Sequence, residues 1–157
     1  MHPRELFTPD DLIVGFDPSD KWEAIRLLVE SLVLRGRLEE AAADDILQAV
    51  LSRERSMSTG MEHGIAIPHA AVDGLDTVVG DIGIVTRPEG LAFDSIDGQP
   101  TRIVVLLLIP RQQKLLHIRT LADIARLLGG ADVRERILAA TTSQEAFEVL
   151  TSGELAS

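Results

Sequence analysis

The sequence lacks cysteine and holds few aromatic residues. Without cysteine, disulfides, thiolate metal sites and cysteine nucleophiles are excluded. Aromatic residues make up 3% of the 157 residues, so we expect a core built from Leu, Ile, Val and Ala. The proportions of hydrophobic and charged residues, 45% and 25%, are those of a globular chain. The length fits one domain over residues 1–157, with a core from about residue 6 to 150.

Long apolar runs and basic clusters are also missing. The longest apolar run, Ile103–Ile109, is far shorter than the about 20 residues needed to cross a bilayer. The first residues lack the basic-then-apolar order of a signal peptide. The net charge is −10, and no cluster of Lys or Arg interrupts this acidic background. We therefore expect a cytoplasmic protein that inserts into no membrane and binds no nucleic acid.

Helical periodicity is found towards both ends of the chain. Asp20 and Glu23 form a capping box before a predicted helix that ends at Gly36. Apolar spacing predicts a second helix over Glu39–Ser52. A second capping box, Thr142 with Glu145, precedes the last of the predicted helices. These later helices cover Lys114–Leu128, Val133–Ala139 and Gln144–Leu150.

The segments between these helices are predicted to form strands. Ile65–Ile67 is a short strand ended by Pro68, Val78–Val85 alternates in part, and Leu91–Phe93 is a short return strand. Ile103–Ile109 is continuously apolar, as in a strand covered on both faces. This order predicts a single-domain α/β sandwich with a mixed sheet of roughly five strands, flanked by helices on both faces.

Two of the four histidines lie at the ends of predicted strands. His69 directly follows Ile65–Ile67, and His117 comes just after the end of the central strand. Open α/β sheets bind ligands outside the carboxyl ends of their strands, so the two side chains could face one another in a site. Two ordinary hydrogen-bonded histidines at the surface are the alternative. His2 lies in the terminus, and His63 is interpreted as loop surface.

The residues from Arg53 to His69 carry a recognisable pattern. They read Arg-Glu, then Ser-Thr-Gly, then Gly-Ile-Ala-Ile-Pro-His. This run resembles the signature of the fructose/mannitol-type enzyme IIA domains of the bacterial sugar phosphotransferase system, a family that includes the nitrogen-regulatory PtsN type. The resemblance covers the chain from about Leu6 to Leu150. It continues through Asp97–Pro100, Ile103–Ile109, Pro110, His117 and Leu121-Ala122.

The resemblance implies a histidine that carries a phosphoryl group. It implies that His69 accepts the group from the phosphohistidine of the carrier HPr, that Arg53 and His117 assist, and that no cofactor or metal takes part. Imidazole is a suitable nucleophile because much of it is unprotonated at neutral pH. A guanidinium can hold phosphoryl oxygens with two parallel bonds, and His117 could donate one more. The implied partners are an HPr-like donor and either an enzyme IIB or a regulated target protein.

The aperiodic segment from Arg53 to Gly64 is predicted to be a loop. The hydroxyls of Ser58 and Thr59, with backbone N–H groups near Gly60 and Gly64, are candidates for the rest of a phosphate cradle. Ordinary turn hydrogen bonds and conformational glycines are the alternative. Arg53 has its own alternative role, as a cation that complements a helix dipole.

The sequence departs from the family pattern at two places that could affect the binding of partner proteins. Ala70-Ala71 follows His69 where many relatives carry a small residue and then a basic one, which could weaken HPr docking. The segment Arg111–Lys114 is polar and basic against the acidic whole. It precedes His117, so it either faces the acceptor or forms a solvated helix start.

Three functions remain open from the sequence. A PtsN-like regulatory role is favoured because no membrane or second carrier domain is fused to the chain. A sugar-transport enzyme IIA that passes its phosphoryl group to an enzyme IIB is the first alternative. A metal hydrolase using His63, His69 and His117 is the remote one, since three histidines can hold zinc. These histidines lack the spacing of helical zinc motifs.

Overall fold

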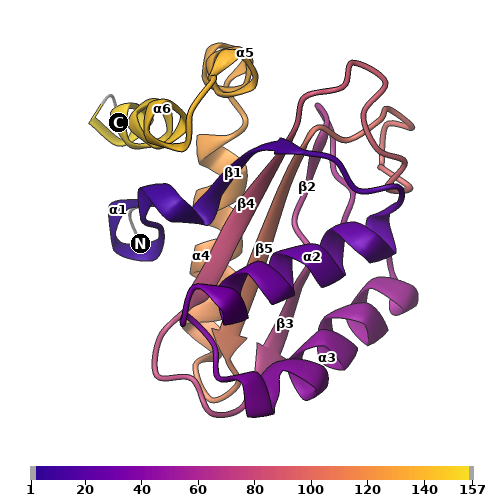
Figure 1. Cartoon of the computed structure of the whole chain (residues 1–157), viewed down its shortest axis with the longest axis vertical. Coiled ribbons are helices and arrows are strands. Elements are labelled where there is room, and N and C mark those ends of the chain that lie inside the picture. Colours follow the sequence, from indigo (N-terminus) through magenta and orange to yellow (C-terminus); the bar gives the residue numbers. More distant parts are fainter. Residues whose placement is uncertain (1–2, 156–157) are drawn as a thin grey trace.

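The fold is built around a mixed five-stranded sheet, seen in a computed structural model that describes residues 3–155 (Figure 1). The strand order is β1-β4-β5-β2, and β3 also pairs with β5. Pairing is antiparallel between β4 and β5 and parallel elsewhere. The strands are β1 (Leu12–Phe16), β2 (Ile65–Ala66), β3 (His69–Val72), β4 (Val79–Val85) and β5 (Ile103–Pro110).

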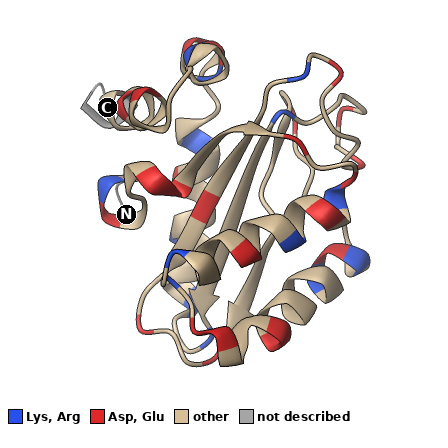
Figure 2. Cartoon of the chain, in the orientation of Figure 1, with Lys and Arg blue, Asp and Glu red and all other residues tan. Residues whose placement is uncertain are grey.

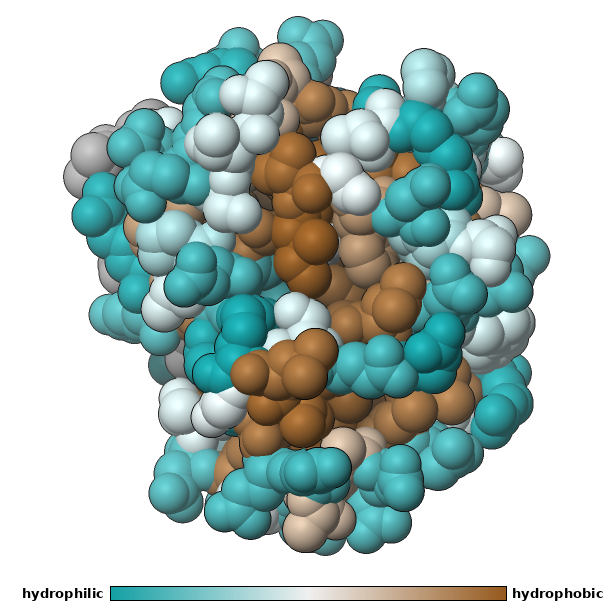
Figure 3. Space-filling view, in the orientation of Figure 1, coloured by the Kyte–Doolittle hydropathy of each residue, from teal (hydrophilic) through white to brown (hydrophobic). Residues whose placement is uncertain are grey.

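Helices cover both faces of this sheet, as predicted (Figure 1). On one face lie α2 (Lys21–Leu34) and α3 (Ala43–Ser56), which pack on each other and on the sheet. The other face carries α1 (Pro3–Leu6), α4 (Lys114–Leu127), α5 (Ala131–Ala139) and α6 (Ser143–Leu155). On the side of α2 and α3, hydrophobic side chains gather along the middle of the molecule, between hydrophilic margins (Figure 3).

Strand β5 forms the centre of the core. Every residue from Ile103 to Pro110 is buried. Successive strand side chains point to opposite faces, so Val105 and Leu107 pack towards α4 and α6, whereas Val104 and Leu106 pack towards α2 and α3. The continuous apolar run thus serves two hydrophobic layers. No helix of the described residues is long and apolar enough to span a membrane.

The chain continues as a strand beyond Pro68, where the sequence predicted a stop. Both β2 and β3 pair in parallel with β5, so that Ile65 lies opposite Ile103 and His69 lies opposite Leu107. Pro68 has no N–H to donate, but its carbonyl accepts the N–H of Leu107 at 3.1 Å. The proline therefore interrupts the ladder without turning the chain, and His69 opens a strand.

Several predicted boundaries were wrong. The first strand, β1, was not predicted at all, and it pairs in parallel with β4. The second helix begins at Ala43 because Glu40–Ala42 form a separate 3-10 turn, η2, and it runs on to Ser56. The predicted return strand at Leu91–Phe93 is reduced to one bridge, from Leu91 to Thr101. His2 lies outside the described residues.

Among Asp, Glu, Lys and Arg, only Asp81 lies within the five strands, which are otherwise free of these residues (Figure 2). Asp81 and Asp11, which ends the 3-10 turn η1 (Pro9–Asp11), are both fully buried. Arg35 bonds to both carboxylates, and Arg37 bonds to Asp11. Burial raises the pKa of Asp81 well above its usual value, although Arg35 opposes the shift. Within the described chain, Asp81 Oδ1 has no hydrogen-bond partner.

Candidate functional site

The two central histidines meet between β3 and the start of α4. Their ring centroids lie 5.4 Å apart with an interplanar angle of 84°, so the rings meet edge to face. His69 is 9% exposed, whereas His117 is half-buried. The N–H of His117 donates to the carbonyl of Gln113 at 3.1 Å, which places His117 in the opening turn of α4. The expectation that the two side chains face one another is confirmed.

One hydrogen bond decides the tautomer of His69. Nδ1 of the ring lies 2.8 Å from the carbonyl oxygen of Ile67. A carbonyl oxygen can only accept, so Nδ1 carries the proton and Nε2 keeps its lone pair. Burial lowers the pKa of His69, and the charges of Arg53 and His117 act in the same direction. A pKa below 6.5 leaves the imidazole mainly neutral at pH 7, with the lone pair on Nε2.

Arg53 lies in the last turn of α3, inside the helix rather than in the predicted loop. Its Nη1 donates to the carbonyl of Met57 at 2.8 Å, the bond expected of a cation at a helix C-terminus. Its charge also lowers the pKa of both His69 and His117, whose own shift comes first from burial. Arg53 thus combines a capping bond with an electrostatic effect on the histidine pair.

The donors of the Ser58–Gly60 loop are bonded within the protein. Ser58 Oγ donates to the carbonyl of Phe93 at 2.5 Å and accepts the N–H of Gly60 at 3.0 Å. The N–H and the hydroxyl of Thr59 both donate to Glu54, at 2.9 and 2.5 Å. In this structure these donors have partners within the protein, as in the alternative of ordinary turn hydrogen bonds, and their binding to phosphate stays a prediction. These bonds attach the loop to Glu54 and to the segment at Phe93.

The two predicted glycines have conformational roles. A Cβ on Gly60 would lie 2.5 Å from the carbonyl oxygen of Phe93, so only glycine fits where the two loops touch. Gly64 has a φ of 76°, which glycine adopts without strain. Its carbonyl accepts the N–H groups of Arg102 and Ile103, at 2.8 and 3.0 Å, and so aligns β2 with β5.

Comparison with known proteins identifies the family. The model of the family described as "Phosphoenolpyruvate-dependent sugar phosphotransferase system, EIIA 2" matches residues 5–153. The chain belongs to this family. The EIIA resemblance seen in the sequence is therefore confirmed, over nearly the whole chain.

Individual relatives of this EIIA chain carry two kinds of name. It is 31% identical over 151 residues to the "Nitrogen regulatory protein" of Bradyrhizobium diazoefficiens, with 96% of this chain and 95% of the relative covered. It is 33% identical over 144 residues to the "PTS system fructose-specific EIIA component" of Haloferax volcanii, with 91% of each chain covered.

Solved structures show the same fold. The nitrogen regulatory protein IIA-Ntr of Neisseria meningitidis matches with a TM-score of 0.82 at 23% identity, covering 94% of this chain and 97% of that one. The mannitol enzyme IIA of Escherichia coli, in its complex with phosphorylated enzyme IIB, matches with a TM-score of 0.75 at 26% identity. That match covers 93% of this chain and 97% of the solved chain.

Two charged residues of this EIIA domain, Lys21 and Glu54, are buried beside the Ser58–Gly60 loop, and neither was predicted to belong to the site. Glu54 is 2% exposed and bonds to Thr59, and Lys21 is 7% exposed with its Nζ 3.3 Å from Glu54 Oε2. The sequence does contain a signal for Glu54. It follows Ile46 and Val50 at intervals of four, so it is an acid on the buried stripe of α3.

The proposed zinc set of three histidines is not assembled. Among the described residues, no group of three His, Asp or Glu side chains could hold a metal ion. His63 is exposed, has a φ of 65°, and donates its N–H to Asp97 Oδ2 at 3.1 Å. His63 therefore belongs to the surface loop, as predicted, and does not join His69 and His117.

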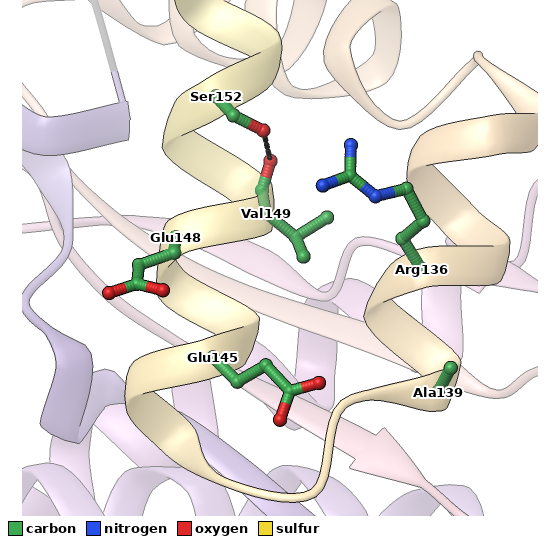
Figure 4. A pocket seen from close by; sticks show the side chains of 6 residues that line it. All are labelled: Arg136, Ala139, Glu145, Glu148, Val149 and Ser152. Atoms are coloured by element: carbon green, nitrogen blue, oxygen red, sulfur yellow. Dashed lines mark hydrogen bonds between the residues drawn. The ribbon is translucent and has the colours of Figure 1, made fainter.

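A separate hollow of 390 Å³ opens between α5 and α6 (Figure 4). Arg136 and Glu145 line it with opposite charges, and Val149 contributes an apolar wall. Ser152 Oγ donates to the carbonyl of Val149 at 2.8 Å, so this hydroxyl is engaged within α6. The hollow contains no histidine and shares no residue with the His69–His117 pair.

Proposed function

We propose that this EIIA domain is a phosphocarrier that takes up a phosphoryl group on Nε2 of His69 from an HPr-type phosphohistidine, in the cytoplasm. The hydrogen bond from His69 Nδ1 to the Ile67 carbonyl carries the proposal. It leaves Nε2 as the nucleophilic nitrogen, in a ring that burial keeps neutral.

The transfer exchanges one nitrogen–phosphorus bond for another. The lone pair of His69 Nε2 forms the new bond to phosphorus as the donor's bond breaks, and the bonding electrons return to the donor's ring nitrogen. The proton stays on Nδ1, where the Ile67 carbonyl stabilises the charge that develops on the ring. Phosphoryl transfer depends mainly on positioning and charge stabilisation. In our proposal Arg53 and His117 supply the donors to the equatorial oxygens.

The downstream role that we propose is regulatory, with a target protein that distinguishes the phosphorylated from the unphosphorylated domain. A relative named as a nitrogen regulatory protein, aligned over 96% of this chain, supports this role. Transfer to an enzyme IIB is the second candidate, supported by the fructose-specific relative and by the mannitol IIA–IIB complex.

Uptake of a labelled phosphoryl group tests whether His69 is the acceptor. The protein is incubated with enzyme I, HPr and labelled phosphoenolpyruvate, and uptake of an acid-labile, base-stable phosphoryl group is expected. His69→Ala should abolish uptake, and His63→Ala, on the exposed loop, should label like the wild type. Wild-type uptake by His69→Ala would disprove the assignment.

A second experiment separates the two downstream roles. The phosphorylated domain is mixed with a purified enzyme IIB, and both forms of the domain are used to capture proteins from the source cell. Loss of label to the enzyme IIB supports transport. Capture of an identified target by only one of the two forms, without label transfer, supports regulation.

A further inference from the structure

A continuous series of hydrogen bonds connects the buried Lys21–Glu54 pair with the imidazole of His69. Lys21 Nζ lies 3.3 Å from Glu54 Oε2, and the N–H of Thr59 donates to the same oxygen at 2.9 Å. The Thr59 carbonyl accepts the N–H of Ile67 at 3.1 Å. The Ile67 carbonyl in turn accepts Nδ1–H of His69 at 2.8 Å. The position of each group therefore depends on the one before it.

Both carboxylate oxygens of Glu54 are occupied within this network. Oε1 accepts the Thr59 hydroxyl at 2.5 Å, and Oε2 accepts Thr59 N–H and the Lys21 ammonium. Hydrogen bonds to a charged group are the strong ones, and a buried carboxylate needs such partners to keep its charge. Glu54 is therefore bonded to Lys21 and Thr59 rather than to His69, although its charge also acts to raise the pKa of His69, against the larger effect of burial.

Lys21 connects Glu54 to a second segment, at Phe93 and Asp94. Its Nζ also bonds to Asp94 at 2.9 Å and lies over the Phe93 ring, 5.5 Å from the centroid. Ser58 Oγ donates to the Phe93 carbonyl, so the loop before β2 is attached to this second segment as well. An apolar pair could fill the same volume, but it would not fix the direction of the Thr59 peptide.

We infer that Glu54 is a positioning residue for phosphoryl transfer: through Thr59 and Ile67 it fixes the carbonyl that keeps the proton of His69 on Nδ1 and the lone pair on Nε2. This inference rests on the function proposed above. If the Ile67 peptide turned, Nδ1 would lose its acceptor and the proton could move to Nε2. The nucleophile would then be lost without any change in His69 itself.

The test is Glu54→Gln, compared with Glu30→Gln in the exposed Arg26–Glu30 pair of α2. Glutamine keeps one acceptor oxygen for the Thr59 N–H, but it removes the negative charge opposite Lys21 and can contact the Thr59 hydroxyl only as a donor, so the charge-assisted bonds of Glu54 are lost. Nitrogen-15 NMR of the imidazole should show a mixture of tautomers in Glu54→Gln and only the wild-type tautomer in Glu30→Gln.

The rate of labelling provides the second readout. At saturating HPr, uptake by Glu54→Gln should be slower by about ten-fold or more, because a small misplacement costs this much in a transfer reaction. The HPr concentration for half-maximal rate should stay unchanged, since the docking surface is intact. A folded Glu54→Gln protein with the wild-type tautomer and rate would overturn the inference and leave Glu54 a structural role only.

Glu54→Asp keeps the inference testable if Glu54→Gln does not fold. Aspartate keeps the negative charge for Lys21, but its side chain is one methylene shorter, so it cannot hold both the N–H and the hydroxyl of Thr59 as Glu54 does. A shift towards mixed tautomers and uptake slower by about three-fold, the effect of one hydrogen bond, would support the inference. Wild-type values would overturn it. The tautomer is measured without a donor, so failure of the wild-type protein to label would overturn the proposed function separately.

Discussion

His117 meets the edge of His69 at a centroid distance of 5.4 Å, and both side chains come from elements adjoining β5. The approach is close enough for one ring to affect the titration of the other, and His117 does contribute to the lowered pKa of His69. Arg53 acts on both rings. The two rings therefore share the influence of Arg53, and they have different tasks in the proposed transfer.

Replacing His117 should slow uptake without preventing it. In our proposal His117 donates to the phosphoryl oxygens but forms no bond to phosphorus, so His117→Gln should lower the single-turnover rate by about ten- to a hundred-fold. Rapid-quench labelling measures the rate, and Arg126→Gln near the end of α4 is the control. An unchanged rate in His117→Gln would remove His117 from the proposed mechanism.

The titration of His69 should reflect its burial. Its pKa lies below the ordinary value of 6.5, so in the folded protein the ring stays neutral as the pH falls to 6.5, whereas the unfolded ring takes up a proton there. Stability supplied by the neutral ring is complete above this pH and is lost below it. NMR titration with and without urea measures both values. A folded pKa at or above the unfolded one would contradict the structure.

Gly60→Ala should destabilise the protein and disturb the loop. The added Cβ would lie 2.5 Å from the Phe93 carbonyl oxygen and 2.9 Å from Ser95 Cα, so the two segments must move apart. Overpacking of this kind costs about 1–3 kcal/mol. Thermal unfolding measures the effect. Gly130→Ala is the control because its Cβ would have its nearest neighbour at 4.0 Å, and equal melting temperatures for the two variants would refute the contact.

Asp81→Asn should stabilise the protein at alkaline pH. Since burial raises the pKa of Asp81 above the ordinary value of 3.8, its contribution to stability is complete below that pH and is lost as the pH rises through the folded pKa. Asparagine carries no charge and can still accept from Arg35. We therefore expect the stability of Asp81→Asn relative to the wild type to increase as the pH rises.

Urea unfolding over a pH series measures this difference. Asp132→Asn is the control, because Asp132 is exposed and its partner Arg136 lies 3.9 Å away. If Asp81→Asn were less stable than the wild type at every pH, the attraction of Arg35 would outweigh the cost of burial.

The sequence contained enough to predict the layers of the fold but not all of its boundaries. The apolar run of β5 and the periodic helices are local signals, and both were confirmed. Strand β1 is only five residues long and includes Gly15, so its local sequence signal for a strand is weak. Its strand conformation depends on the pairing with β4. Pro68 signals a chain break, but the neighbouring β5 extends the strand beyond it.

The candidate site was predicted less completely than the fold. The family pattern pointed to His69, Arg53 and His117, and the structure shows that the two rings meet. The partners of Glu54 were not predictable from the sequence, because Glu54 and Asp94 lie 33 and 73 residues away from Lys21, which bonds to both. Only tertiary packing brings such partners together. The sequence alone therefore did not reveal that the hydroxyls of Ser58 and Thr59 bond within the protein.

The pairing of β3 with β5 also limits when the site can form during synthesis of the chain. His69 belongs to a strand that pairs with β5, which emerges from the ribosome later, and His117 follows later still. Pairing between segments far apart in sequence is slow and needs both of them to be present. A nascent chain that ends before Ile103 therefore carries His69 but neither the strand that β3 pairs with nor His117. On the function that we propose, this strand order would delay phosphoryl uptake until β5 and α4 are made.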